Sequence, residues 1–342
     1  MSNPVINNIE KNSRFQYIDI AKGILIVLVV INHLPQVAKL QFDNNSLNIL
    51  SKANFLWAFY FMPAFFIITG YCSSFDKSFL NFFIKNFKQI MIPAIIINIL
   101  LKWFENLISF DPNISHYTHV GIREFLVKGS HWWFLPSLFL AKCVFFLQNK
   151  YIKNKYIILV SSIFLLFFGL FSYKTNVINI WWFQQSFVLN IFIIIGHFIR
   201  IYNYRFNKNI IYLCAIISFT YCFFRKFNSE SGFEYIAQTI NIQYHTIPLF
   251  LFIAISGSIF IILISKKIDK CAILEIMGKY SLFIYILHVR IIKYFFSIFL
   301  EYTHSPFGYI CLTISAVIVT LYISCSIYYL FNKYAPWVLG KF

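Results

Sequence analysis

The stretch RFQYIDIAKGILIVLVVINHLPQ, residues 14–36, decides the fold class of this chain. It contains an apolar run of the length that a helix needs to cross a bilayer, about 20 residues. The segment before it, MSNPVINNIEKNSRF, lacks the short apolar core and the cleavage site of a secretory signal peptide. We therefore expect residues 1–17 to form a cytoplasmic segment and the first membrane helix to be retained.

Nine more apolar runs of similar length follow along the chain. Hydrophobic residues make up 59% of the 342 residues and charged residues only 12%, whereas soluble domains carry about a quarter charged residues. Without a soluble domain or an internal repeat, the sequence predicts one all-α, polytopic membrane helix bundle over residues 1–342. Its ten expected transmembrane helices are centred on residues 18–36, 54–72, 89–104, 132–148, 156–172, 182–199, 209–224, 246–265, 279–300 and 307–331.

The basic residues between these runs predict the orientation of the chain. With the N-terminus inside, 17 of the 29 Lys and Arg residues fall in cytoplasmic segments and seven in outer segments. Basic residues of short loops collect on the cytoplasmic side, so both termini are expected on that side. The protein itself is expected in the inner (cytoplasmic) membrane of a bacterium. This division explains much of the net charge of +17 without a nucleic-acid-binding stripe. The expected partner is the lipid bilayer, with no nucleic acid.

The sequence gives little support for a metal site. The seven Cys residues are scattered singly through apolar stretches, without a CxxC pair, and are expected to pack as small hydrophobic residues. His116 and His119 have the spacing of one helical turn but no Cys or carboxylate partner nearby. They lie in the longest outer segment, residues 105–131, which is a candidate interfacial or re-entrant helix. We therefore expect no metal.

The first expected helix carries three polar residues within its apolar run. Lys22 and His33 are eleven residues apart, close to three helical turns, so they share a face about 16 Å apart along the axis. Asp19 precedes Lys22 by one turn. Ionisable groups at such depths are expensive and often functional. Two interpretations stay open here, a catalytic His33 and a buried histidine that is satisfied by structural hydrogen bonds.

A second histidine lies in GKYSLFIYILHVRII, residues 278–292. His288 follows Gly278 by ten residues, or about 15 Å of helix, and Ser281 and Tyr285 lie on a similar face. Two imidazoles from distant helices could line one cavity. The alternative for His288 is a structural hydrogen bond to a neighbouring helix.

Six stretches resemble, in order along nearly the whole chain, the membrane acyltransferase 3 family, especially its sugar or fucose O-acetyltransferases. In the first helix the family pattern corresponds to Tyr17, Ile18, Asp19, Lys22, Gly23 and His33. The second stretch contains Met62, Pro63, Gly70 and Tyr71. The other four are FFIKNFKQIMIP, which resembles the basic loop entering the third helix, HWWFLPSLFL, IGHFIR and SLFIYILHV.

This resemblance implies the substrates. The donor would be acyl-CoA, most commonly acetyl-CoA, with no tightly bound cofactor, and the acceptor a hydroxyl of a surface or lipid-linked polysaccharide. Lys22, Lys85 and Lys88 would bind the anionic nucleotide at the cytoplasmic side. Many family members have Arg at these positions. Lys binds phosphate as a point charge without the fork of Arg, so the charge is kept and the geometry altered.

The resemblance also assigns roles to the remaining candidates. His33 would act as a general base, for which the ordinary pKa of histidine is suited, or would carry a covalent acyl group. Asp19 would balance Lys22, while His288 with Tyr285 would position the acceptor or stabilise developing charge. Apart from the resemblance, Trp133 and Arg290 are acceptor-binding candidates; Trp133 fits an interfacial aromatic belt, and carbohydrate stacking on Trp133 is the alternative.

Two other functions compete with an acyltransferase. A transporter or flippase of a lipid-linked sugar would also use buried charge, but inverted repeats and paired broken helices, which are frequent in transporters, are not evident in the sequence. A membrane sensor or assembly factor without catalysis would use the buried polar groups only for structural pairing.

Overall fold

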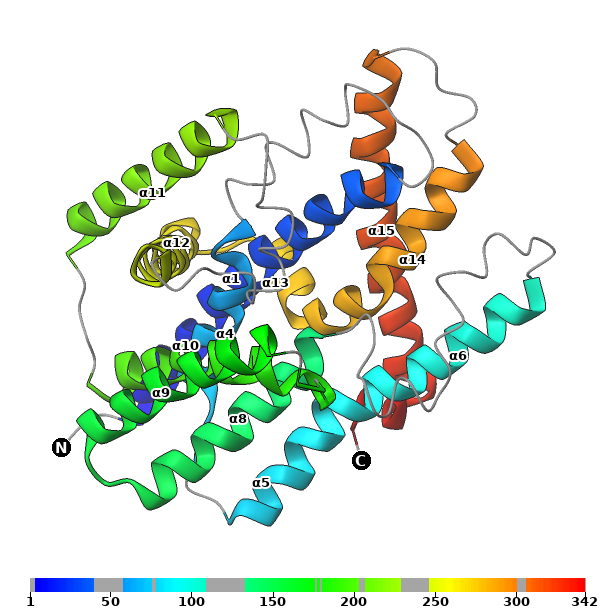
Figure 1. Cartoon of the computed structure of the whole chain (residues 1–342). Coiled ribbons are helices and arrows are strands. Elements are labelled where there is room, and N and C mark those ends of the chain that lie inside the picture. The colour runs from blue at the N-terminus through cyan, green and yellow to red at the C-terminus, as the bar shows by residue number, and fades with distance from the viewer. Residues whose placement is uncertain are drawn as a thin grey trace. The chain divides into compact units, whose positions relative to one another are not determined.

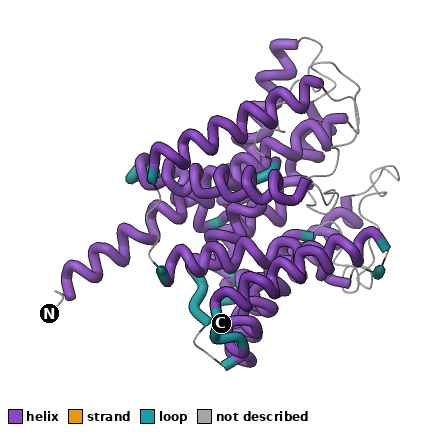
Figure 2. Tube along the Cα trace, turned by 60° about the vertical axis from the view of Figure 1, so that its left-hand side comes forward, coloured by secondary structure: helices purple, strands orange, loops and turns teal. Residues whose placement is uncertain are grey.

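The computed structural model describes residues 4–39, 58–75, 78–108, 133–175, 177–178, 180–202, 207–228, 246–299 and 306–341. Every regular element in these ranges is a helix, and none is a strand (Figures 1 and 2). This confirms the all-α class.

Seven helices in the described ranges are long and apolar enough to cross a membrane. They comprise residues Gln16–Pro35, Phe79–Phe104, Lys155–Lys174, Ile180–Ile201, Ile247–Ile268, Ser281–Phe299 and Phe307–Tyr334. Phe61–Cys72 and Lys208–Cys222 are shorter apolar helices. The chain is thus a multi-pass membrane protein, while the expected number of ten spans is not confirmed.

The chain folds into two compact units, each assembled from segments that are distant in the sequence. Unit 1 comprises Met1–Phe65, Arg205–Phe233 and His245–Leu330, and unit 2 comprises Phe66–Tyr204, Glu234–Tyr244 and Phe331–Phe342. The expectation of a single domain over residues 1–342 stays a prediction. Unit 1 holds α1 (Pro4–Lys39), α11 (Lys208–Asn228), α12 (Ile247–Ile268), α13 (Ala272–Lys279), α14 (Ser281–Phe299) and most of α15 (Pro306–Tyr334).

In unit 1, α1 packs against α12, α13 and α14 (Figure 1). Two glycines permit its close contact with α13. A Cβ atom on Gly23 would collide with the carbonyl group of Leu274, and a Cβ atom on Gly278 would collide with that of Asp19. Small residues let helix backbones approach closely in membranes. The crossing is therefore fixed at two points, one glycine from each helix.

The ninth expected helix, residues 279–300, is interrupted near its start. Its first residue, Lys279, ends α13, and α14 begins after Tyr280. The Tyr280 ring stacks on that of Tyr328 of α15, with 3.9 Å between the ring centroids. The apolar run indicated where the span lies but gave no sign of this break, because the break is held by a partner on another helix.

Unit 2 contains the rest of α4 (Phe61–Cys72) and the helices from α5 to α10. These are α5 (Phe79–Asn86), the π-helical turn η1 (Phe87–Met91), α6 (Ile92–Ile108), α8 (Phe134–Tyr151), α9 (Lys155–Lys174), the 3-10 turn η3 (Ile180–Trp182) and α10 (Phe183–Ile201). The short 3-10 helix η7 (Pro336–Leu339) near the C-terminus belongs to the same unit.

A second pair of glycines joins α4 to α10. A Cβ atom on Gly70 would meet the carbonyl of Ile193, and one on Gly196 would meet the carbonyl of Ile67. Arg200 then donates to the backbone carbonyl of Ser73 over 3.0 Å. The glycines and the arginine that carried part of the family resemblance in these helices therefore have a structural role, which is to lock the two helices together.

The basic stretch FFIKNFKQIMIP is helical, so its interpretation as a loop was wrong. Lys85 lies on α5 and Lys88 on η1, and the helix continues into α6 without a break. Pro93 has no N–H to donate to the carbonyl of Gln89, one turn back. A single wider turn beside such a proline keeps the helix continuous.

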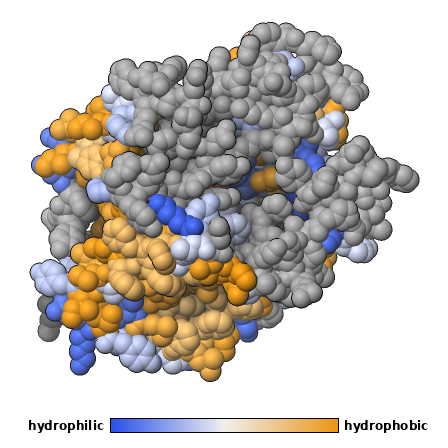
Figure 3. All heavy atoms as spheres, viewed as in Figure 1, coloured by the Kyte–Doolittle hydropathy of each residue, from blue (hydrophilic) through white to orange (hydrophobic). Residues whose placement is uncertain are grey.

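The outer face of α9 is suited to lipid. Exposed apolar side chains on this helix include Ile157, Val160, Phe164, Phe167 and Phe171. Figure 3 shows hydrophobic atoms over much of the face of unit 2 that carries α8 and α9. An apolar surface of this kind in contact with water would be unfavourable, and in a bilayer it is expected.

Candidate active site

The two histidines that the sequence singled out lie in contact in unit 1. His33 of α1 and His288 of α14 have ring centroids 4.9 Å apart, with the ring planes inclined by 52°. His288 is 2% exposed, and His33 is partly buried. The structure therefore brings together, from helices far apart in the sequence, the two groups best suited to proton transfer.

The hydrogen bonding of His288 defines its tautomer. Its Nδ1 lies 2.7 Å from the backbone carbonyl oxygen of Tyr285. Because a carbonyl oxygen only accepts, Nδ1 carries the proton, and Nε2 of the neutral ring has the lone pair. This Nε2 is buried and has no hydrogen-bond partner among the described residues. An unsatisfied buried acceptor costs about 1–3 kcal/mol, so the atom is suited to accept a hydrogen bond from a donor that forms during a reaction.

Tyr285 contributes its main chain to this arrangement. Its carbonyl oxygen is the group that fixes His288, and its ring lies 5.6 Å from the His288 ring, centroid to centroid. The Tyr285 side chain is buried. The sequence named Tyr285 correctly as a neighbour of His288 but could not show that its backbone makes the hydrogen bond.

Asp19 and Lys22 form an ion pair on the same helix as His33. Nζ of Lys22 lies 3.3 Å from Oδ1 of Asp19, and both side chains are partly exposed. On the preceding turn of α1, Gln16 donates to Oε1 of Glu275 of α13 over 2.9 Å. The charged groups therefore gather near the α1–α13 crossing, and His33 lies about three turns further along α1.

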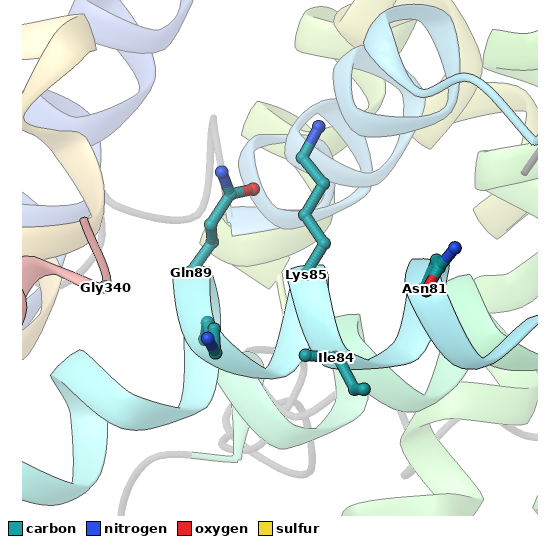
Figure 4. A pocket seen from close by; sticks show the side chains of 6 residues that line it. Asn81, Ile84, Lys85, Gln89 and Gly340 are labelled. Carbon is teal, nitrogen blue, oxygen red and sulfur yellow. The ribbon is translucent and has the colours of Figure 1, made fainter. Parts of the chain in front are cut away.

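Lys85 and Lys88 line a pocket in unit 2. Its volume is about 320 Å³, and its lining consists of Asn81, Ile84, Lys85, Lys88, Gln89 and Gly340. Figure 4 shows the side chains of Lys85 and Gln89 pointing to the same side of their helix. Two ammonium groups beside two amide side chains supply donors for an anion.

Four of the six lining residues of this pocket, Asn81, Ile84, Gln89 and Gly340, were not named from the sequence. Asn81 and Gln89 precede and follow Lys85 by four residues, so helical spacing applied to α5 and η1 together would have found them. Gly340 comes from the other end of the chain, and no local pattern connects it with Lys85. The apolar run of α8 also contains a cation, Lys142, whose Nζ lies 5.8 Å from the centroid of the Phe82 ring in the same unit.

The two acceptor-binding candidates belong to different units, Trp133 to unit 2 and Arg290 to unit 1. Trp133 is 8% exposed and packs edge to face with Phe134. Arg290 follows His288 by two residues on α14, so its side chain leaves the opposite side of that helix. His116, His119 and most of the outer segment 105–131 lie outside the described residues.

Comparison with known proteins agrees with these motifs. A family model described as an acyltransferase domain, of the acyltransferase 3 family, matches residues 15–329. No curated protein and no solved structure matches the chain. The match includes both histidines, the Asp19–Lys22 pair and the helix of Lys85 and Lys88. The chain therefore belongs to the acyltransferase 3 family and is a multi-pass membrane acyltransferase.

Proposed function

We propose that this protein is an O-acetyltransferase of the bacterial inner membrane that moves an acetyl group from acetyl-CoA to a hydroxyl of a surface or lipid-linked polysaccharide. The observation that carries the proposal is the contact between His33 and His288, with a lone pair on Nε2 of His288. Acyl transfer to a hydroxyl needs a base for the hydroxyl proton, and two imidazoles in contact, one of them buried, suit that need.

In the proposed reaction, His33 takes the proton of the acceptor hydroxyl while the hydroxyl oxygen attacks the thioester carbonyl carbon. The C–S bond breaks when the tetrahedral intermediate collapses, CoA leaves as the thiolate, and the proton on His33 neutralises it. Nε2 of His288 accepts a hydrogen bond from the His33 imidazolium and so stabilises it. A second route, through an acyl group carried by His33, would show as a labelled protein when acceptor is withheld.

Acetyl-CoA is a long donor, so different residues serve its two ends. Its phosphates carry the negative charge, and we assign them to the pocket with Lys85 and Lys88. Ligand pockets have volumes of roughly 300–1,000 Å³, and about 320 Å³ suits part of a nucleotide. Lys22, held by Asp19, is the third cation that we assign to the donor.

We propose that Tyr285 helps to position the acceptor hydroxyl, while His288 stabilises the charge that develops on His33. Trp133 and Arg290 are the proposed sugar-binding residues. Trp133 is buried and packs edge to face with Phe134, so its ring also has a structural role.

The test uses membranes that contain the protein, incubated with acetyl-CoA labelled on the acetyl group. Label should pass to envelope polysaccharide with the native protein and not with His33→Ala at equal abundance. Mass spectrometry of surface glycans from cells with and without the gene should show the acetyl group as a mass increase of the modified sugar. If cells without the gene export the glycan normally but do not acetylate it, the proposal is supported. If those cells do not export the glycan and the native protein does not label it, a transporter is supported instead.

A further inference from the structure

We propose that the last residues of the chain form a wall of the donor pocket and hold the turn that carries Lys88. This C-terminal hook comprises residues 335–341 and follows α15. The inference rests on the proposed function, because it assumes that the pocket of Lys85 and Lys88 binds the phosphates of acyl-CoA. It deepens that proposal by adding a segment that lies beyond the family match, which ends at residue 329.

The hook has a defined local structure. Residues Pro336–Leu339 form a 3-10 helix, the N–H of Gly340 donates to the carbonyl of Trp337 over 3.0 Å, and the N–H of Lys341 donates to that of Pro336 over 3.2 Å. Val338 is 1% exposed, and the 3-10 helix packs against α6. A buried valine thus anchors the hook, and the hydrogen bonds fix the direction in which its last residues leave.

Gly340 makes the contact that matters for the pocket. Its φ is +69°, a left-handed conformation that side chains other than that of glycine seldom adopt. A Cβ atom on Gly340 would collide with the carbonyl group of Lys88 and approach the Cα of Gln89. Figure 4 shows Gly340 beside the helix turn that carries Gln89. Backbone therefore lies directly on backbone, with no side chain between them.

The turn that this contact supports is a wide one. In η1 the N–H of Ile92 donates to the carbonyl of Phe87, five residues back, and Pro93 cannot donate at all. π-Helical turns are rare and occur mostly as single turns, frequently at functional sites. A turn of this kind needs support from its neighbours to stay in one conformation. The hook supplies such support at Lys88 itself, and Gly340 is also one of the residues that line the pocket.

The inference predicts an effect on donor binding rather than on chemistry. Gly340→Ala in the full-length protein combines an unfavourable φ with a collision at Lys88, so the KM for acetyl-CoA should rise about tenfold or more. The kcat at saturating donor should stay within about twofold, because the histidines are untouched. CoA alone, titrated into the purified protein in detergent, should show the same loss of affinity.

Two further variants separate the possible causes. Gly340→Asn tolerates a positive φ better than Ala but still carries a Cβ atom; we expect it to fail as well, because the collision with Lys88 remains. Gly169→Ala is the matched control, since its Cβ atom would approach the carbonyl of Gln184 in the same unit at 2.7 Å, far along the chain from the pocket residues. It should lower thermal stability without raising the KM for the donor.

The outcomes distinguish this inference from the proposed function. If the double variant Lys85→Ala, Lys88→Ala binds CoA normally, the assignment of this pocket to the donor is wrong, and the proposed role of the hook is wrong as well. If that variant loses CoA while Gly340→Ala binds it normally, only the role of the hook is wrong. Equal losses of stability and of donor affinity in Gly340→Ala and Gly169→Ala would also overturn it. If Gly340→Ala does not accumulate in membranes, the same measurements can be made on Val338→Ala, which removes part of the buried side chain that anchors the hook.

Discussion

Gly278 leaves space for the carbonyl oxygen of Asp19, because any side chain at position 278 would occupy the same volume. This contact joins α13 to α1 ten residues before His288 and fourteen residues before His33. Together with the reciprocal contact of Gly23 at Leu274, it sets the register in which the two imidazoles meet.

Replacing Gly278 should therefore damage both stability and activity. Gly278→Ala inserts a methyl group into a closed contact, and such overpacking typically costs about 1–3 kcal/mol. We expect a lower midpoint of thermal unfolding in detergent and a loss of transfer to glycan. Ile276→Ala, at an exposed position of the same helix, is the control and should change neither. Native activity in Gly278→Ala would show that the histidine contact does not depend on this crossing.

His33 is the residue that we expect to be essential. His33→Ala should abolish transfer and leave membrane insertion intact. General acid–base catalysis typically accelerates a reaction by about 10²–10⁴-fold, and we expect the rate of transfer to fall by that order or more. His33→Gln keeps polarity but cannot take a proton at neutral pH, so it should be nearly as inactive. A folded Gln variant with normal glycan acetylation would make His33 a structural hydrogen-bonding group.

Two substitutions of His288 separate its nitrogens. Asn places its amide N–H near the position of Nδ1 and can still donate to the Tyr285 carbonyl, whereas Gln reaches toward the position of Nε2. If the lone pair on Nε2 acts in catalysis, His288→Asn should retain thermal stability and lose about 10²-fold or more in kcat. His288→Gln offers an acceptor without basicity and should keep more activity than Asn if accepting a hydrogen bond is enough. Wild-type turnover in the Asn variant would show that His288 contributes only its hydrogen bond to the Tyr285 carbonyl and takes no part in catalysis.

Lys22 gives a test of charge at the donor end. Lys22→Arg keeps the charge and the pairing with Asp19, so it should retain activity, while Lys22→Ala should raise the KM for acetyl-CoA strongly. Lys267→Ala, an exposed cation at the end of α12, should leave that KM unchanged. Equal loss in both Lys22 variants would indicate that packing at the ion pair matters rather than attraction for phosphate.

Helix α9 gives a matched test of topology, because basic residues lie at both of its ends. In a variant without native cysteines, a single Cys at Lys174 should react with a membrane-impermeant thiol reagent from outside, and one at Lys153 should not. Cys at Asn113 is expected outside as well. The reverse labelling of Lys153 and Lys174 would overturn the orientation deduced from the basic residues.

The sequence predicted the parts of the structure that depend on local composition. Apolar length located spans such as Lys155–Lys174 and Ile247–Ile268 within a few residues, because the bilayer sets that length. Periodicity on α1 placed Asp19 beside Lys22, and these two residues form an ion pair. The spacing of His288 from Gly278 indicated how far along its helix His288 lies, although the sequence did not predict the break at Tyr280.

The missed features depend on contacts between distant segments. The helix that carries Lys85 was taken for a loop, because its lysines interrupt the apolar run, whereas its other faces are covered by rings such as that of Phe82 against Phe146 of α8. The bond from His288 to a backbone carbonyl leaves no mark on side-chain patterns. Gly340 meets Lys88 across some 250 residues of chain, and only the folded protein shows that contact.

The position of the hook has a practical consequence for handling the protein. An affinity tag or fluorescent protein fused directly after Phe342 begins a few residues from Gly340, beside the pocket that Gly340 lines. Such a fusion would disturb a short segment that is anchored by the buried side chain of Val338. The purified enzyme would then lose affinity for its donor because of the fusion and not because of its own sequence. A tag before α1 avoids this load, so enzymes tagged at the two ends should be compared before any measured KM is assigned to the native chain.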